Sequence, residues 1–247
     1  MTPQLRRFLD LIDKQIIVSC QAVGKEPFND VHGITLMAKA VLEGGATVLR
    51  LSQPEHIRAI QTLTKFPIIG LIKATYPESD VFITPTIKEV QQLLELNVDC
   101  IALDATLRPR PDGEKVENLI KYIRVVAPNT LIMADCSNLE DVAHATKMDV
   151  DLIGTTLRGY TAETKGQTNL EDNYQFIKDC LQLVDKPLIA EGGFWDHDDI
   201  YNVLKLGATA VVVGTAITRP REITKRYMQK LRVKRLRKGG HHEHQQD

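Results

Sequence analysis

The sequence predicts a single (β/α)8 barrel, and three observations carry this prediction. The chain has 247 residues, close to the roughly 250 residues typical of this fold. Apolar runs bounded by turn residues recur eight times along the chain, and segments of helical period lie between them. Each alternation occupies about 31 residues, which is the size of one strand–helix unit.

Each predicted strand is a nearly continuous apolar run, as expected for a parallel sheet covered by helices. The first four strands are predicted at residues 16–19, 46–49, 67–72 and 100–103. The pattern repeats at residues 130–134, 152–154, 187–190 and 210–213. An open doubly wound sheet is the alternative, but no Gly-x-Gly-x-x-Gly follows the first strand, where a dinucleotide-binding fold places it.

Helices are predicted between the strands, for example over residues 86–96 and 114–126, where apolar residues recur with helical period. Two sequence signals mark helix starts. Thr86 precedes Glu89 at the spacing of a capping box, and Asn138 precedes an acidic first turn. Strand and helix therefore alternate along the whole chain.

The composition is that of a globular protein with a substantial core, because 43% of residues are hydrophobic and 26% are charged. The N-terminus has no apolar signal segment, and the apolar runs are far shorter than the roughly 20 residues that span a bilayer. We therefore expect a cytoplasmic protein with no membrane partner. The four cysteines form no Cys-x-x-Cys pair, so we expect small, buried, reduced thiols.

The C-terminal end of the chain is strongly basic. Residues 223–242 contain eight Lys and Arg residues and no Asp or Glu. Such a stretch can contact nucleic acid or anionic lipid, but the solvated end of a last helix followed by a loose tail is the favoured interpretation. We therefore predict a catalytic barrel over residues 1–231 and a basic, flexible tail over residues 232–247, without a nucleic-acid partner.

Polar side chains follow most of the predicted strands, at the end where such barrels place their chemistry. In chain order they are Gln21 (after Ser19 and Cys20), Arg50, Lys73, Asp104, Asp135 and Glu191. Their convergence on one mouth favours an active site. None of the seven histidines follows a strand, so no metal site is predicted there. No Ser or Cys has a His placed for acyl transfer. The Lys, Asp, Glu and Arg side chains at the strand ends therefore favour acid–base chemistry.

Glycines after the last two predicted strands indicate a phosphate site. Gly192 and Gly193 follow strand seven, and Gly214 and Thr215 follow strand eight. Glycines allow backbone N–H groups to approach an anion, and a short following helix adds a favourable dipole. Arg219 can add a charge-assisted hydrogen bond. The alternative is that these glycines only form tight turns.

Several motifs occur in a fixed order, at residues 17–22, 67–73, 81–84, 101–106, 133–137, 154–161 and 213–220. Together they resemble the N-acetylmannosamine-6-phosphate 2-epimerases of sialic acid catabolism, and the resemblance extends from about Gln15 to Leu231. Two stretches depart from that family. Its members commonly continue the lysine of strand three with Arg-Asp, where this chain has Ala74-Thr75, and residues 193–197 are also unusual.

The resemblance implies a (β/α)8 fold of the ribulose-phosphate-binding-barrel type, no organic cofactor, and a homodimer. It assigns catalysis to Lys73, with Glu191 as the other acid–base candidate. It also implies roles for seven further residues: sugar contacts by Gln21, Arg50 and Asp135, and phosphate contacts by Gly192, Gly214, Thr215 and Arg219. The implied reaction interconverts N-acetylmannosamine 6-phosphate and N-acetylglucosamine 6-phosphate.

Inversion at carbon 2 requires removal of a proton next to a carbonyl and its return to the opposite face. A lysine, with an ordinary pKa of about 10.4, serves as base near neutrality only if burial or a neighbouring cation such as Arg50 lowers that pKa. Glu191 is then the second acid–base group, although a one-base route through the substrate's own groups stays open. Two other functions also stay open: a Schiff-base lyase using Lys73, and a non-catalytic phosphosugar-binding barrel.

Overall fold

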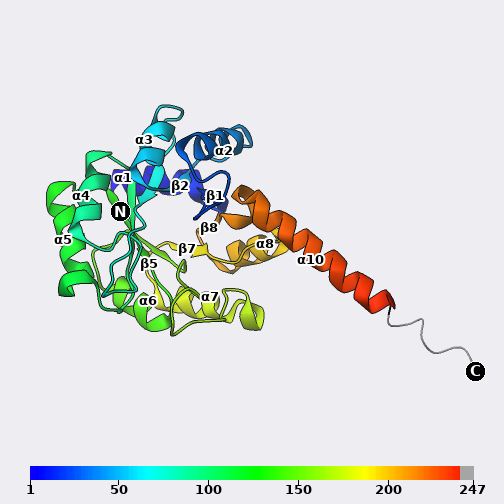
Figure 1. Cartoon of the computed structure of the whole chain (residues 1–247). Coiled ribbons are helices and arrows are strands. Elements are labelled where there is room, and N and C mark those ends of the chain that lie inside the picture. Colours follow the sequence, from blue (N-terminus) through cyan, green and yellow to red (C-terminus); the bar gives the residue numbers. More distant parts are fainter. Residues whose placement is uncertain (240–247) are drawn as a thin grey trace, which may run out of the picture.

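The structure, a computed structural model, describes the backbone of residues 1–239 and the side chains of residues 1–231. Eight parallel strands form a closed barrel in the order β1 to β8, with β8 paired to β1 (Figure 1). The predicted (β/α)8 fold is confirmed. The strands are β1 Gln15–Cys20, β2 Leu49–Ser52, β3 Ile68–Leu71, β4 Cys100–Asp104, β5 Leu131–Asp135, β6 Leu152–Gly154, β7 Leu188–Glu191 and β8 Ala210–Val213.

Helices surround the barrel and also precede its first strand. They are α1 Pro3–Ile12, α2 Val31–Glu43, α3 Pro54–Gln61, α4 Ile87–Glu95, α5 Val116–Val126, α6 Leu139–Thr146, α7 Glu171–Leu183, α8 His197–Leu206, α9 Thr215–Thr218 and α10 Pro220–Gly239, with a 3-10 turn at Pro111–Gly113. The predicted helix starts are confirmed. Thr86 and Asn138 are the N-caps of α4 and α6, and each helix has a capping box.

The predicted strands lie within one residue of those observed, except the second. That strand was expected at residues 46–49, whereas β2 spans Leu49–Ser52. Ala46 and Val48 are buried, but the pairing with β1 begins at Leu49. An apolar run in the sequence predicts which residues are buried. The start of a strand depends instead on where its backbone forms hydrogen bonds with a neighbouring strand. As a consequence Arg50 lies inside the strand rather than after it.

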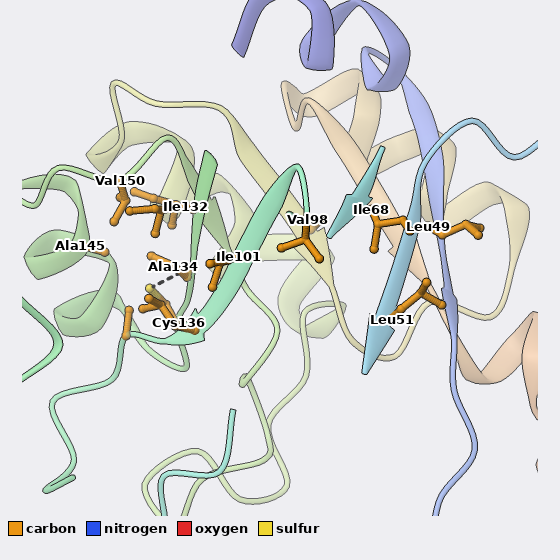
Figure 2. Close-up of a cluster of buried hydrophobic side chains, with 14 of the residues drawn as sticks. Leu49, Leu51, Ile68, Val98, Ile101, Ile132, Ala134, Cys136, Ala145 and Val150 are labelled. Carbon is orange, nitrogen blue, oxygen red and sulfur yellow. Dashed lines mark hydrogen bonds between the residues drawn. The ribbon is translucent and has the colours of Figure 1, made fainter. Parts of the chain in front are cut away.

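Alternation along the strands divides the core into two layers. One layer fills the space between strands and helices, and Figure 2 shows part of it, including Leu49 and Leu51 of β2 and Ile101 of β4. The other layer fills the barrel. Phe8 and Ile12 of α1 join that inner layer, so the N-terminal helix, which the sequence reasoning did not anticipate, closes one end of the barrel.

Helix α10 extends away from the barrel (Figure 1). It runs to Gly239, so the predicted boundary at residue 231 falls inside a helix. The rest of the predicted tail, residues 240–247, lies outside the described residues. Within residues 1–239 no helix is both long and apolar enough to cross a membrane, and the same residues contain no group of three or more potential metal-ligating side chains. The four cysteines are buried and free, as predicted.

Candidate active site

The carboxyl-terminal end of the barrel opens into a cavity of about 670 Å³. Strand alternation directs polar side chains into it. Leu71 and Met133 belong to the inner layer, and Lys73 and Asp135, two residues further on, continue the same inward phase. Eight of the nine predicted site residues line the cavity: Gln21, Arg50, Lys73, Glu191, Gly192, Gly214, Thr215 and Arg219.

Arg50 is the centre of the charged cluster, and only 2% of its surface is exposed. Its Nη2 and Nη1 atoms donate to the two oxygens of Asp135 at 2.6 and 3.4 Å. Its Nε atom lies 3.3 Å from Oε1 of Glu191. One guanidinium therefore binds carboxylates from β5 and β7, Asp135 through two nitrogens and Glu191 through one.

Burial shifts the two acid–base candidates in opposite directions. It raises the pKa of Glu191 to about 7, against the opposing effect of the Arg50 charge. It lowers the pKa of Lys73 below its ordinary value, and the Arg50 charge adds to that lowering. Both shifts bring proton exchange closer to neutrality, which general acid–base catalysis requires.

The backbone around Lys73 is held by the neighbouring loops. Lys73 pairs with Ile83 in an isolated antiparallel bridge. The side chain of Gln53 donates to the carbonyl of Lys73 at 3.2 Å, and the N–H of Thr84 donates to the carbonyl of Ile72 at 2.7 Å. The lysine thus extends from a braced segment, although it lies beyond the last residue of β3.

Two of the predicted polar strand ends do not reach the cavity. Asp104 and Asp135 are fully buried, with no exposed surface. Asp104 instead bonds Thr106 at 2.6 Å and Arg108 at 2.5 Å, so the expectation that it lies at the mouth is wrong. The loop after β4 folds back and neutralises it. Asp135 is bound by Arg50 and holds that arginine in place, and its predicted contact with the sugar stays a prediction.

The glycine turns after β7 and β8 have specific steric causes. Gly192 has a φ of 111°, a conformation that favours glycine. The amide of Asn169 donates to the carbonyls of Glu191 and Gly192 at 2.7 and 3.0 Å. A Cβ on Gly214 would collide with the side-chain amide of Gln21. These contacts account for the glycines without a ligand, so their phosphate-binding role stays a prediction.

Arg219 lines the cavity next to these turns, and one edge of its guanidinium is hydrogen-bonded to Glu26. Its Nε and Nη2 atoms lie 3.0 and 2.8 Å from Oε1 of Glu26, and Nη2 of Arg221 lies 2.9 Å from the same oxygen. Burial opposes ionisation of Glu26, but hydrogen bonds from Arg219 and Val23 hold its pKa below the ordinary value. No described residue accepts a hydrogen bond from Nη1 of Arg219, so this part of the guanidinium remains available to an anion.

Sequence reasoning missed two contributions to the cavity. Thr156 lies two residues after Gly154 of β6 and lines the wall; continuing the strand alternation by two residues would have identified it. Helix α10 supplies the other contribution, with Arg226 placed 4.6 Å from the centre of the Trp195 ring. The wall residues of α10 are Glu222, Lys225, Arg226 and Gln229.

The fold and this site define a (β/α)8-barrel protein with a lysine and a glutamate beside a buried arginine in one cavity. A family model described as "Putative N-acetylmannosamine-6-phosphate epimerase" matches residues 34–233. The chain therefore belongs to the N-acetylmannosamine-6-phosphate epimerase family, as its motifs predicted.

Individual relatives agree with this assignment. A "Putative N-acetylmannosamine-6-phosphate 2-epimerase" from Malacoplasma penetrans (strain HF-2) is 58% identical over 221 residues, covering 89% of this chain and 96% of the relative. A protein of the same description from Staphylococcus aureus (strain JH9) is 48% identical over 214 residues, covering 87% and 96%. The solved N-acetylmannosamine-6-phosphate 2-epimerase from Clostridium perfringens is 42% identical with a TM-score of 0.84, covering 90% of this chain and 95% of that one.

Proposed function

We propose that this chain epimerises N-acetylmannosamine 6-phosphate at carbon 2 to N-acetylglucosamine 6-phosphate, in amino-sugar and sialic acid catabolism. Its family relatives supply the substrate and the product. The observation on this chain that carries the proposal is the pairing of Lys73 with Glu191 in one cavity, with their pKa values shifted in opposite directions. Such opposed shifts are typical of acid–base catalysts.

In the proposed reaction Lys73 removes the carbon-2 proton from the open-chain sugar. Its pKa is lowered by burial and by Arg50, so a larger fraction is neutral and able to accept a proton. The electrons of the carbon–hydrogen bond move toward the carbonyl oxygen. The Arg50 guanidinium, which lines the cavity, stabilises the negative charge that develops there.

Glu191 then delivers a proton to the opposite face of carbon 2. A carboxyl group with a pKa of about 7 is partly protonated near neutrality and can both donate and accept. In this proposal Asp135 acts by holding Arg50, and Gln21 contacts the sugar. The phosphate binds at the far side of the cavity, to the backbone N–H groups of Gly192, Gly214 and Thr215 and to the side chain of Arg219.

The test is proton NMR of the purified protein with N-acetylmannosamine 6-phosphate in deuterated water, without added metal. We expect N-acetylglucosamine 6-phosphate to appear with deuterium at carbon 2. The Lys73→Ala variant, if folded, should lose about 10²- to 10⁴-fold in turnover, the range for a general base. Near-normal turnover in that variant would remove Lys73 from the mechanism.

Other outcomes would support the competing functions. A covalent sugar adduct on Lys73 after borohydride reduction would indicate a Schiff-base lyase. Binding without deuterium exchange would indicate a non-catalytic barrel. The Glu191→Gln variant separates two-base from one-base transfer. With two bases it should exchange the carbon-2 hydrogen of one epimer without forming the other, whereas a one-base route should still give both epimers.

We further propose that the enzyme acts in the cytoplasm as a homodimer. Four free, buried cysteines suit a reducing compartment, and the dimer is implied by family resemblance. Analytical ultracentrifugation should detect a species of twice the 27.7 kDa chain mass. A single species at the chain mass over the working concentration range would contradict the dimer.

A further inference from the structure

Thr156 lies between the two carboxylates of the charged cluster. Its Oγ1 atom is 2.6 Å from Oδ1 of Asp135 and 3.1 Å from Oε2 of Glu191. The absence of a side chain at Gly154 makes this approach possible, because a Cβ there would lie 3.0 Å from both Asp135 Oδ1 and Thr156 Oγ1. One hydroxyl group thus links the carboxylates that Arg50 also binds.

A hydroxyl group has one hydrogen to donate, so it can satisfy only one of two ionised carboxylates at a time. Asp135 is bound by two nitrogens of Arg50. Because Thr156 Oγ1 is closer to Asp135 than to Glu191, the hydroxyl of Thr156 donates its hydrogen bond to Asp135. Glu191 then faces a lone pair of Thr156, and a favourable contact requires Glu191 to carry a proton on Oε2 and donate it. If Glu191 is ionised, the hydroxyl must turn to donate to it. Each protonation state of Glu191 therefore matches one orientation of Thr156.

We propose that Thr156 is a positioning residue whose hydroxyl turns from Asp135 to Glu191 as Glu191 gives up its proton, so that it stabilises the carboxylate formed in the reaction. This inference rests on the proposed function, in which Glu191 is the second acid–base group. In the step itself the O–H bond of Glu191 breaks, a C–H bond forms at carbon 2, and the electron pair stays on Oε2. Thr156 keeps its own hydrogen throughout, and only its direction changes.

The surroundings of Glu191 leave Thr156 as the one neutral donor to its carboxylate among the described residues. The charged groups that face this carboxylate are Arg50 from β2, Asp135 from β5 and Lys73 after β3. A hydrogen bond from a hydroxyl to an ionised carboxylate is stronger than one between neutral groups. When the hydroxyl turns away, Asp135 keeps both of its hydrogen bonds from Arg50, whereas ionised Glu191 gains its one neutral donor. Thr156 therefore favours the ionised form of Glu191, against the burial that favours the neutral form.

The neighbouring threonine supplies a matched control. Thr155 accepts from the N–H of Glu191 at 3.0 Å and donates to its carbonyl at 3.2 Å. It is fully buried and bonds the main chain of Glu191 rather than its carboxylate. Thr155→Val and Thr156→Val thus remove adjacent hydroxyls that hold different parts of the same residue.

The experiment measures kcat, KM and the pH profile of kcat/KM for the epimerisation in the wild type, Thr156→Val, Thr156→Ser and Thr155→Val. We expect Thr156→Val to lower kcat about tenfold with KM within about twofold, a loss equivalent to one charge-assisted hydrogen bond. In the pH profile of kcat/KM, the apparent pKa of the limb assigned to Glu191 should rise by about one unit, because the ionised carboxylate loses its hydrogen-bond donor. Thr156→Ser, which keeps the hydroxyl, should restore both kcat and the limb.

Each remaining outcome decides against the inference. An unchanged limb in Thr156→Val would show that the hydroxyl does not act on Glu191. Equal impairment of Thr156→Ser would assign the effect to the lost methyl group, and an equal shift in Thr155→Val would assign it to a general disturbance of β7. Wild-type protein that fails to epimerise would instead overturn the proposed function, so the two failures are distinguishable.

Discussion

Each end of the barrel holds an arginine between two carboxylates. The two clusters differ in whether their hydrogen bonds involve backbone atoms or side chains. At the carboxyl-terminal end Arg50 binds the carboxylates of β5 and β7. At the opposite end Arg124 of α5 lies 3.1 Å from Asp149 and 2.7 Å from Asp151. Each cluster pairs one arginine with two carboxylates, an Asp and a Glu at one end and two Asp at the other. Formal charge therefore cannot explain why Arg50 lines the cavity and Arg124 does not.

The Arg124 cluster secures the main chain. Arg124 donates to the carbonyls of Thr130 and Asp149, each at 2.9 Å, and Asp151 accepts from the N–H of Ile132 at 2.8 Å. Arg50, by contrast, donates only to side chains among the residues that the structure describes. The Arg124 cluster therefore ties separate backbone segments together, whereas the Arg50 cluster joins side chains at the cavity.

The largest expected effect comes from removing each arginine. Arg50→Met leaves the fully buried Asp135 and the partly exposed Glu191 without their cation, so we expect a loss of about 3–5 kcal/mol in unfolding free energy. Arg124→Met should cost about 1–2 kcal/mol, because water can reach Asp149, whose side chain is 77% exposed. Urea denaturation of both variants at pH 8 measures the difference. Equal losses would mean that the two clusters are energetically alike.

A smaller effect should appear in the pH dependence of stability. The pKa of Glu191 rises from 4.5 to about 7 on folding, so between those pH values the folded state binds a proton that the unfolded state has lost. Wild-type stability from this group is therefore full below about pH 4.5 and falls as the pH rises through 7. The Glu191→Gln variant lacks this pH dependence of stability because a glutamine side chain does not titrate. Its stability relative to wild type should increase by about 2 kcal/mol from pH 5 to pH 8.

Urea denaturation of Glu191→Gln and wild type at pH 5, 6, 7 and 8 measures this change, and Glu191→Asp is the matched variant that retains a titrating group. A difference between Gln and wild type that stays flat with pH would show that Glu191 is ionised throughout. In that case Arg50 would outweigh burial, and the cluster at the mouth would resemble the one at the opposite end.

Much of the architecture could be predicted from the sequence, because periodicity and turn residues are local signals. The closed order of the strands, the capping box at Thr86 and the helix start at Asn138 followed from them. The inward positions of Lys73 and Glu191 followed from the convergence of strand ends. The shift of β2 could not be predicted, because an apolar run does not reveal which of its residues pair with β1 and β3.

The site was less predictable wherever two distant segments meet. Asp104 and Asp135 look alike as polar residues at strand ends, but Arg108 folds back onto the first and Arg50 reaches across the barrel to the second. Strand alternation indicates that Thr156 faces the cavity, but only the tertiary structure brings its hydroxyl between two carboxylates. Such pairings depend on the tertiary structure, and no spacing along the chain encodes them.

The smallest expected effect concerns a third arginine–carboxylate cluster, at the rim of the cavity, where Glu26 holds Arg219 and Arg221. Glu26 binds one edge of Arg219, which lines the cavity. If Arg219 binds the phosphate as we propose, Glu26 orients it for that contact. Glu26→Ala should therefore raise KM for the phosphosugar about tenfold, equivalent to about 1.4 kcal/mol, with kcat within about twofold. Glu26→Gln retains an acceptor oxygen for Arg219 and should stay closer to wild type.

A decrease in KM in both Glu26 variants would contradict this prediction. Glu26 also carries a negative charge, and burial does not suppress its ionisation because Arg219 and Val23 donate to it. If its repulsion of the phosphate outweighed its hold on Arg219, both variants would lower KM, and Glu26→Gln would do so without loss of orientation. A lowered KM would thus show that the charge of Glu26 opposes binding of the phosphate, and a raised KM would show that its hold on Arg219 prepares that arginine for the substrate.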